Sequence, residues 1–265
     1  MPDSNPSPLH WKPVSAPGPT TLRGRYVTLE PLNAQRHTAA LWEAVHGHDD
    51  LWEYLFDGPF ATEADLRMSI EQKEAANSAV FLAIVPAKSA IREGTGASRI
   101  SEGAGAFMPL NEGENARPSG PASSSAATAA GYASFMRMEP AHGVVEVGNI
   151  LLSPALQRTT AATEAMYLMG RHVFDDLGYR RYEWKCNAEN EPSRRAALRL
   201  GFTFEGIFRQ HMVIKDRNRD TAWFSILDHE WPARKAAFES WLAPANFDEN
   251  DRQRHTLSEI AATQR

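Results

Sequence analysis

The sequence predicts an α/β protein in which helices pack on a mixed β-sheet. Segments with apolar side chains at every second position, as expected of strands, alternate with segments whose apolar side chains recur three and four positions apart, as expected of amphipathic helices. The 265 residues are 42% apolar and 23% charged, which suffices for one good core or two small ones. No internal repeat is evident, so we expect a layered domain built from these elements.

The first elements follow a proline-rich segment, residues 1–20, which we expect to be a disordered or extended arm. Asn33 is placed to cap one helix, and Thr62 with Asp65 forms the pattern of a capping box at the start of the next. The elements expected up to residue 86 are a strand over 23–32, a helix over 34–47, a short aromatic helical segment over 49–60, a helix over 63–78 and a buried strand over 79–86.

Residues 87–130 are a low-complexity insertion. They contain Gly, Ser, Ala and Pro but hardly any large apolar residue, so they bury too little surface to offset the entropy of ordering them. The strands on either side are expected to be neighbours in one sheet, which makes the segment an insertion in a hairpin loop and not a linker between domains. A role as a lid over a site stays open.

The second half returns to regular patterns, with Gly201 placed just past the end of a helix. Alternation in "RYEWKCNA" puts Cys186 on the same face as Tyr182 and Trp184, as a small buried residue. The elements expected here are strands over 131–140 and 143–152, a helix up to 174, a strand over 180–188, a helix over 190–201, a strand over 202–214, a turn over 215–220, a strand over 221–231, a helix over 232–243 and a polar tail over 244–265.

Composition excludes several classes of function. The formal net charge is −5 and the basic residues are scattered, which argues against nucleic acid as a partner and suits an amine substrate. No apolar run approaches the roughly 20 residues of a bilayer span, and the N-terminus has no signal-peptide pattern, so we expect a cytoplasmic protein without a membrane partner. The single cysteine, Cys186, excludes an internal disulfide. His46 and His48 have no further ligands at useful spacing, so no metal is expected.

The turn in "LLSPALQRTTAATEAMYLMGRHVF", residues 151–174, is built from small side chains. A helix N-terminus exposes unpaired backbone N–H groups and the positive end of the helix dipole, and it binds an anion where nothing bulky blocks it. The alternative is that the turn is small because the helix packs against the sheet.

A family resemblance bears on this choice. "EVGNILLSPALQRTTAATEA" (146–165), followed by "WKCNAENEPSRRAALRLGFTFEG" (184–206), resembles the GCN5-related N-acetyltransferases, or GNAT family, in particular the branch of ribosomal-protein and small-amine acetyltransferases. The specific part is a Q-x-x-G-x-A-like turn followed at family spacing by Asn190, Ser193 and "RLGF". The resemblance runs from Leu22 to Trp241 without the insertion. It implies a single α+β domain over 21–243, with a mixed, mostly antiparallel, twisted sheet flanked by helices.

The resemblance also implies a cofactor site for acetyl-CoA. The strand end that pairs with the pantetheine arm and directs a backbone N–H at the thioester carbonyl is matched by Ile150, Leu151 and Leu152. Asn190 matches a residue that reaches the pantetheine or the sulfur end. The loop whose backbone amides hold the pyrophosphate is matched by Gln157, Arg158, Thr159, Thr160, Ala161, Ala162 and Thr163.

The sequence departs from the family in two places. Thr160 stands where the family usually has glycine, and its hydroxyl could itself bond a phosphate oxygen. Many relatives place a tyrosine in the later helix as the acid for the leaving thiolate, and none lies between Asn187 and Gly201. Ser193 is then the nearest candidate for the acid. Asn190 and Ser193 would equally serve as capping residues of the helix that follows.

Acetyl transfer to an amine needs a group that takes a proton, because an amine with a pKa of about 10 is mostly protonated at neutral pH. Glu146 is the candidate base, directly or through water; alternatively it is a solvated strand residue opposite Arg137. The acceptor is expected against the early helices, although most of the rings there could instead be core. The candidate acceptor-binding residues are Trp52, Tyr54, Asp57 and Phe60.

The sequence therefore predicts an acetyl-CoA-dependent N-acetyltransferase that moves an acetyl group to a primary amine, of a small molecule or a peptide α-amine, by direct attack in a ternary complex. The competing interpretation is a CoA-binding or interaction protein that keeps the fold without turnover. A nucleotide-binding protein is disfavoured because no Gly-rich loop with lysine and no G-x-G-x-x-G is present. An exposed last strand and a terminal helix with Trp241 make a homodimer an open expectation.

Overall fold

The structure, a computed structural model, describes residues 10–87 and 128–264. Its centre is a sheet in the order β1-β2-β3-β4-β5-β6-β8-β7, antiparallel throughout except for the parallel pair β5 and β6. The strands are β1 Leu22–Arg23, β2 Val27–Pro31, β3 Ala79–Pro86, β4 Gly131–Glu139, β5 Val144–Leu152, β6 Arg181–Asn187, β7 Thr203–Ile214 and β8 Arg217–Leu227. The expected mixed, mostly antiparallel sheet is confirmed.

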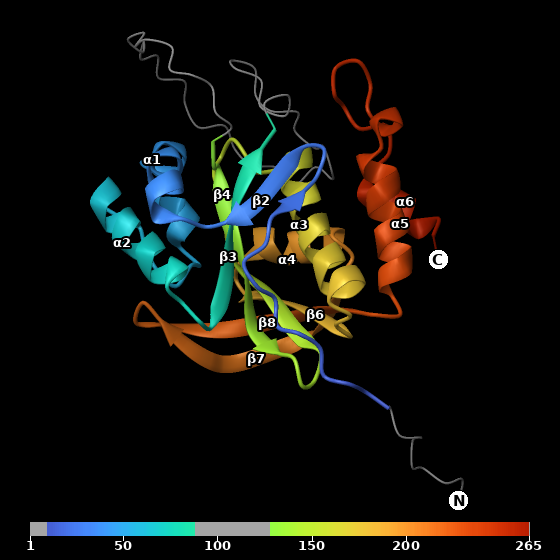
Figure 1. Ribbon diagram of the computed structural model, residues 1–265, viewed down its shortest axis with the longest axis horizontal. Helices are drawn as coiled ribbons and strands as arrows, with labels where there is room; N and C mark the ends of the chain where they lie inside the picture. Colours follow the sequence, from blue (N-terminus) through green and yellow to red (C-terminus); the bar gives the residue numbers. More distant parts are fainter. Residues whose placement is uncertain (1–9, 88–127, 265) are drawn as a thin grey trace, which may run out of the picture.

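Helices cover both faces of this sheet. Figure 1 shows α1 and α2 on one side of β2, β3 and β4, with α3 and α5 on the other. The helices are α1 Ala34–Val45, α2 Glu63–Glu74, α3 Thr160–Arg171, α4 Glu191–Arg199, α5 Trp231–Leu242 and α6 Leu257–Ala262, with the short 3-10 helices η1 Asp49–Trp52 and η4 Pro244–Asn246 and the π-helical segment η3 His172–Asp176. The expected caps are present: the Asn33 side chain accepts from Arg36 N, and Thr62 forms a capping box with Asp65.

Two apolar cores lie on opposite faces. The larger one lies under α3, α4 and α5 and includes Val145, Trp184 and Phe224. The smaller one lies under α1 and α2 and includes Trp52 and Tyr132. Because α1 and α2 pack over β2 to β4, the same face of β5, β6 and β8 carries no helix in the described parts of the chain. That uncovered area is called the open face below.

The strands β5 and β6 part before they end. Their parallel register runs from Val144–Arg181 to Val147–Trp184, and no further pair joins them among the described residues, although β5 continues to Leu152 and β6 to Asn187. Asn149 has φ +49°, and the pairing of β4 with β5 shifts register here. One edge of β5 is therefore left open beyond Val147.

Helix α3 is tied to the first strands by Glu164. Its carboxylate, 5% exposed, accepts the backbone N–H of Arg25 at 2.9 Å, of Tyr26 at 2.6 Å and of Val27 at 3.0 Å. A β-carbon added to Gly24 would collide with that carboxylate, so the turn must be glycine at this point. These bonds fix the direction in which the N-terminus of α3 points.

The two chain ends differ from expectation. Residues 10–20 are extended and attached, with Trp11 Nε1 donating to Ala141 O at 2.8 Å and Val14 N to Pro140 O at 3.1 Å, so of the two alternatives, a disordered or an extended arm, the extended one holds for this part. Residues 1–9 lie outside the described residues. The prediction of a polar tail beyond Ala243 was also wrong, because this segment contains α6. The side chain of Leu257 in this helix is 2% exposed and belongs to the larger core. A capping box at Thr256 starts that helix.

The β7–β8 hairpin corrects the strand boundaries. The predicted turn over 215–220 shrinks to Lys215 and Asp216, both at positive φ, and β8 begins at Arg217. The last strand, β8, pairs with β6 and β7 on its two sides, so it is not an edge strand, and β7 forms this edge of the sheet. Trp241 is fully buried, and neither argument for a dimer therefore holds.

The ends of the insertion are held in the sheet. β3 and β4 pair antiparallel, as expected, and Ala130 N donates to Ile84 O at 2.9 Å. Ala129 and Ala130 are buried, so the low-complexity stretch extends into ordered chain at its C-terminal end. The remainder of the predicted insertion, 88–127, lies outside the described residues.

Candidate active site

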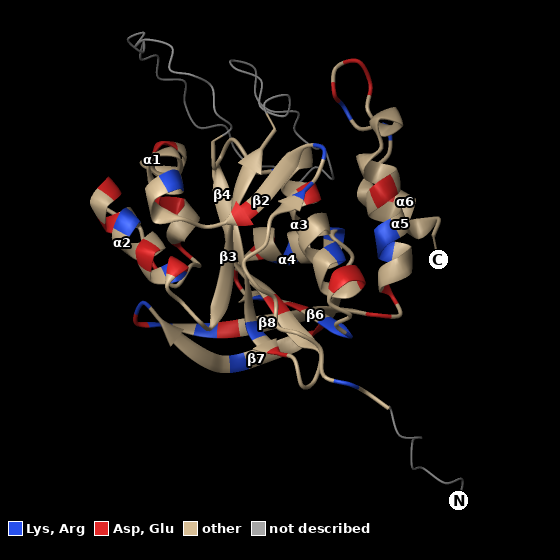
Figure 2. Ribbon diagram, in the orientation of Figure 1, with Lys and Arg blue, Asp and Glu red and all other residues tan. Residues whose placement is uncertain are grey.

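Strand alternation places charges on the open face. In β6 the rings of Tyr182 and Trp184 enter the larger core, so Glu183 and Lys185 point the other way. In β8 the same alternation sends Phe224 to the core and its neighbours Trp223 and Ser225 to the open face. Figure 2 shows basic and acidic residues interspersed along β6, β7 and β8.

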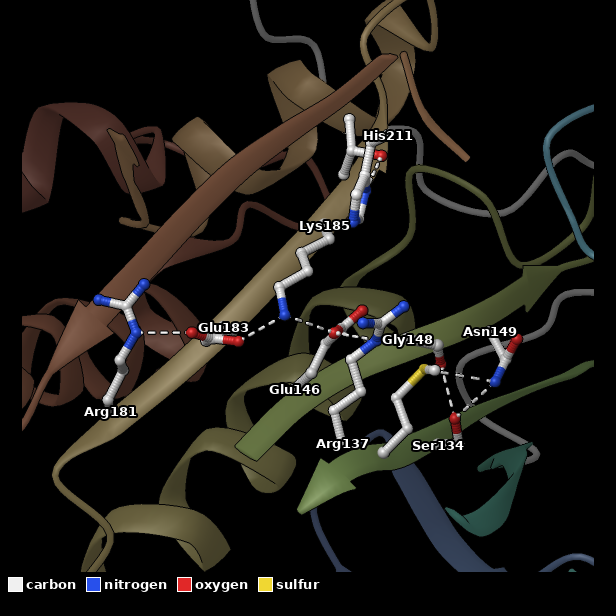
Figure 3. A network of polar contacts seen from close by, with 11 residues as sticks. Ser134, Arg137, Glu146, Gly148, Asn149, Arg181, Glu183, Lys185 and His211 are labelled. Carbon is white, nitrogen blue, oxygen red and sulfur yellow. Dashed lines mark hydrogen bonds and ion pairs between the residues drawn. The ribbon is translucent and has the colours of Figure 1, made fainter. Parts of the chain in front are cut away.

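A row of alternating charges crosses the open face, and it is called the charged row below. Its members are Arg137, Glu146, Lys185, Glu183, Arg181 and Glu205. Consecutive members are in contact: the N–O distances are 3.2 Å for Arg137–Glu146, 3.0 Å for Glu146–Lys185, 2.7 Å for Lys185–Glu183, 2.7 Å for Glu183–Arg181 and 2.8 Å for Arg181–Glu205. Figure 3 shows the row from Arg137 to Arg181. Each buried charge is thus compensated by its neighbours.

Glu146 lies where β5 and β6 part. It is 4% exposed, and burial raises the pKa of its carboxyl group although Lys185 and Arg137 oppose that rise. Both cations contact Oε2. The other oxygen, Oε1, lies beside Gly148, since a β-carbon added there would be 3.4 Å from it and would collide with Met136 Sδ. The sulfur of Met136 occupies the position that a β-carbon at residue 148 would take, so glycine is needed there for Met136 to pack beside the carboxylate.

Three further side chains of the open face were missed from the sequence. Lys185, whose side chain is 5% exposed, lies 3.8 Å from the centre of the Trp223 ring. His211 hydrogen-bonds Thr221 Oγ1 through Nδ1 at 2.9 Å, and desolvation followed by the charges of Arg137, Arg219 and Lys185 lowers its pKa, which favours the neutral imidazole. Arg219 is 7% exposed. Alternation in "RYEWKCNA" already held the signal for Lys185, whereas Arg219 fell within the predicted turn.

The N-terminus of α3 is small but partly capped. Thr159 is the N-cap: its hydroxyl accepts from Ala162 N at 3.1 Å and donates to Leu156 O at 2.7 Å. The first N–H groups of the helix, at Thr160 and Ala161, have no acceptor within the helix. Arg158 has φ +60°, which turns the chain into the helix. The packing alternative also applies, because Ala161 is 1% exposed and belongs to the larger core.

The other residues expected to hold the cofactor lie around this turn and the parting strands. Gln157 Nε2 donates to Leu152 O at 3.0 Å, which joins the turn to the strand end. Leu151 is buried at 1%, whereas Ile150 and Leu152 are partly exposed on the open edge of β5. Thr163, 4% exposed, accepts from Arg199 Nη1 at 3.1 Å and is engaged in the packing of α3.

Asn190 and Ser193 have structural tasks at the start of α4. Asn190 Oδ1 caps the helix by accepting from Ser193 N at 3.0 Å, which leaves its Nδ2 group for another partner. Ser193 Oγ accepts from Trp184 Nε1 at 3.0 Å. The capping alternative is therefore present for Asn190, and the Ser193 hydroxyl also lies within hydrogen-bond reach of the Cys186 thiol.

Some of the predicted acceptor-binding residues lie in the smaller core, and others lie in the loop after η1. Trp52 is 2% exposed and packs edge-on against Phe60 in the smaller core, at 5.0 Å between ring centres, so it does not face a site and its assignment as an acceptor-binding residue was wrong. Asp57 is bound by Lys73 and by Ser69 Oγ at 2.7 Å. Tyr54 is partly exposed in the loop after η1. The tip of the β7–β8 hairpin contacts this loop, since Lys215 Nζ donates to Trp52 O and Asp57 O at 2.8 and 2.9 Å.

Within residues 10–87 and 128–264 no group of three or more His, Cys, Asp and Glu side chains is placed to hold a metal ion. None of the helices in the described part of the chain is long and apolar enough to cross a membrane.

The fold and this site define a class of protein: a mixed sheet whose parallel strands part beside an open helix N-terminus, as in the GNAT acetyltransferases. Residues 27–203 match the family described as acetyltransferase (GNAT) domain. The crystal structure of a GCN5-related N-acetyltransferase from Brucella melitensis is similar with a TM-score of 0.80 and 42% identity, covering 96% of this chain and 99% of that chain. The chain belongs to the GNAT family, whose cosubstrate is acetyl-CoA.

Two more relatives share this class. A GNAT-family acetyltransferase from Chromobacterium violaceum ATCC 12472 is similar in crystal structure with a TM-score of 0.68 and 34% identity, over 88% of this chain and 98% of that chain. The ribosomal-protein-serine acetyltransferase of Escherichia coli (strain K12) is 30% identical over 101 residues, which are 38% of this chain and 56% of that relative. The chain thus spans little more than half the length of that curated relative.

Proposed function

We propose that the protein is an acetyl-CoA-dependent N-acetyltransferase that moves an acetyl group to a primary amine, with the amine attacking directly in a ternary complex. The observation that carries the proposal is Glu146: a buried carboxylate with one oxygen turned toward Gly148, where β5 and β6 part. Acetyl-CoA supplies the acetyl group as a thioester.

The residues around the parting strands fit such a cosubstrate. Beyond Val147 the edge of β5 has no neighbouring strand among the described residues, so an amide-bearing arm could pair there as an added strand would, between Gly148, whose carbonyl accepts from Ser134, and Leu152, whose carbonyl accepts from Gln157. The N–H groups of Thr160 and Ala161 at the start of α3, with the positive end of the helix dipole, suit a diphosphate. Ile150, Gln157, Arg158 and the small residues up to Thr163 form the rest of this proposed site, together with Asn190.

Glu146 is proposed to take the proton that the attacking amine loses, directly or through a water molecule. A carboxyl pKa above the usual range brings the base closer to neutral pH, which favours proton transfer. Lys185 and Arg137 hold Oε2 and thereby orient the carboxylate, so that Oε1 faces Gly148. A backbone N–H at the open end of β5 would stabilise the negative charge on the thioester oxygen. Ser193 would donate a proton to the leaving thiolate.

The acceptor is proposed to enter over the open face, between the charged row and the loop that carries Tyr54, Asp57 and Phe60. The name of the Escherichia coli relative supports a peptide α-amine as one acceptor class, and a small amine is the other. The alternative function, a CoA-binding protein without turnover, would use the same site. Binding of the cosubstrate therefore does not distinguish the two functions, whereas release of free CoA does.

The test measures CoA thiol release from acetyl-CoA with a panel of primary amines, for the wild-type protein and for Glu146→Gln. We expect amine-dependent release, and a kcat/KM lowered by about 10²- to 10⁴-fold in the variant, which is the range of general-base contributions. Glu205→Gln, at the far end of the charged row, serves as the matched control and is expected to keep the rate.

Thermal midpoints with and without acetyl-CoA separate the outcomes. A stabilised protein that releases no CoA with any amine would favour the non-catalytic alternative. Release that is unchanged in Glu146→Gln would leave the acetyltransferase intact and remove Glu146 as its base. Double-reciprocal kinetics with a parallel, ping-pong pattern would contradict direct transfer.

A further inference from the structure

Arg219 is a buried guanidinium without an acidic partner among the residues that the structure describes. It is 7% exposed, its Nε has no hydrogen-bond partner, and it forms no ion pair with any residue that the structure describes. Its recorded contact is the ring of Phe56, whose centre lies 5.2 Å from the guanidinium carbon. Burying a charge without compensation is costly, and desolvation accordingly lowers the pKa of Arg219. Such a group needs a reason to be there.

The other cations of the open face are compensated. Arg137 contacts Glu146, Lys185 contacts both Glu146 and Glu183, and Arg181 contacts Glu183 and Glu205. The charged row therefore has three cations and three anions and is balanced within itself. Arg219 adds one positive charge that no anion of the charged row balances.

Arg219 lies on the sheet beside the loop after η1, which carries the proposed acceptor-binding residues Tyr54, Asp57 and Phe60 and is called the acceptor loop below. On β8 it pairs with Met212 of β7 and lies two residues before Thr221, which holds His211. Phe56 belongs to the loop after η1, and the hairpin tip is bound to that loop through Lys215. The groups that act electrostatically on Arg219 are Cys186, Glu146 and Arg137, so the guanidinium lies near the proposed base as well.

We propose that Arg219 binds a carboxylate of the acceptor, so that the enzyme acetylates amines that also carry an acidic group. The inference rests on the proposed function and narrows its acceptor class. A planar guanidinium with free N–H groups matches a carboxylate in a bidentate pair, and partial burial strengthens such a pair. Phe56, 41% exposed, offers an apolar surface beside it for the part of the acceptor that joins amine and acid.

The test compares matched amines, 4-(aminomethyl)benzoate with 4-(aminomethyl)benzamide and amino acids with their amides, by CoA release. For the wild-type protein we expect kcat/KM to favour the carboxylate of each pair by about 10- to 100-fold, as expected for hydrogen bonds to a charged group. Arg219→Gln should remove this preference and leave the KM for acetyl-CoA unchanged. Arg217→Gln, an exposed arginine on the same strand, is the matched control and should keep the preference.

Several results would overturn the proposal. Equal rates for carboxylate and amide in the wild-type protein would do so, as would a preference that survives in Arg219→Gln. A raised KM for acetyl-CoA without a change in preference would assign Arg219 to the cosubstrate instead. The thermal midpoint of Arg219→Gln checks folding; Arg219→Lys, which keeps the charge but not the planar fork, gives a second variant with an intermediate preference.

Failure of the proposed acetyltransferase function can be distinguished from failure of the proposed carboxylate site. If no amine releases CoA, the thermal midpoint with 4-(aminomethyl)benzoate or 4-(aminomethyl)benzamide, in the presence of CoA, still measures the anion site. Stabilisation by the carboxylate alone, lost in Arg219→Gln, supports the site in a protein without turnover. An equal response to both compounds contradicts it.

Discussion

The two faces of β5, β6 and β8 differ in how they bury their side chains. On the helix-covered face, rings such as Tyr182, Trp184 and Phe224 pack in the larger core. On the open face, Glu146 and Lys185 have side-chain exposures of 6% and 5% within the charged row, although no helix of the described residues covers them. One face gains stability from apolar packing, whereas the other holds charges in place by mutual compensation.

The largest expected effect is a difference between the two faces in how much a substitution lowers the free energy of unfolding. Phe224→Ala removes a ring that is 1% exposed, and it should lower the free energy of unfolding by about 3–5 kcal/mol through the cavity it leaves. Ser225→Ala, the next residue, removes only the hydroxyl that donates to Glu205 at 2.7 Å and should lower it by about 1–2 kcal/mol. Denaturant unfolding followed by circular dichroism measures both. Equal losses in the free energy of unfolding would contradict the conclusion that apolar packing on the helix-covered face supplies more stability than the open face.

The next effect concerns proton affinity on the open face. Lys185→Met leaves Glu146 facing Glu183 without the cation between them, so the pKa of Glu146 should rise further. Because the base acts as a carboxylate, the acidic limb of the pH profile of kcat/KM should move to higher pH. At a pH well below this pKa, each unit by which the pKa rises should lower kcat/KM roughly tenfold. Lys235→Met, whose partner Asp175 lies on the covered side, should leave the profile in place.

The stability of the Lys185→Met protein should follow the same sign. A carboxyl group whose folded pKa is raised contributes stability that is complete below its unfolded pKa and is lost as the pH rises through the folded value. The variant should therefore lose more stability than wild type between acid and neutral pH. An unshifted acidic limb would show that Glu146 is not the titrating group.

The smallest effect tests whether the start of α3 serves the fold or the cosubstrate. Thr159→Ala removes the N-cap and should lower the free energy of unfolding by about 1 kcal/mol, since Ala162 N loses its acceptor. It also frees that N–H for an anion, so binding of acetyl-CoA should persist. Thr160→Ala, whose hydroxyl makes no bond to the described residues, should leave stability within about 0.5 kcal/mol of wild type. Loss of binding in Thr159→Ala alone would mean that the cap shapes the phosphate site.

Local patterns were enough for most of the fold. Asn33 and the Thr62–Asp65 pair started their helices as predicted, and Gly201 follows the C-cap of α4 at φ +91°. The patterns failed where a partner far away in sequence decides. Polar residues over 215–220 suggested a loop, yet from Arg217 onward they form β8, because pairing with β6 and β7 stabilises them. Leu257 likewise finds its core only through α5.

The site was predicted in the same uneven way. Glu146 could be found because it lies two residues before Gly148 within a family motif. Lys185 could have been found from the alternation in β6, which places it on the face opposite Tyr182 and Trp184. Arg219 could not be found, because its role depends on which strands lie beside it and on whether an acidic group faces it. Trp52 lies at the end of η1, in a predicted aromatic segment whose rings could line a site or pack in the core, and its burial at 2% shows that the core alternative holds for it.

The Glu164 contact has a consequence for the order in which the chain folds. It joins residues up to 139 positions apart, so the direction of α3 cannot be fixed before the first strands and the later helix meet. The entropy of closing such a loop grows only with the logarithm of its length, so the span 88–127 inside it adds about 0.3 kcal/mol to the cost. Lengthening the chain between β3 and β4 therefore changes the free energy of joining α3 to the first strands only slightly.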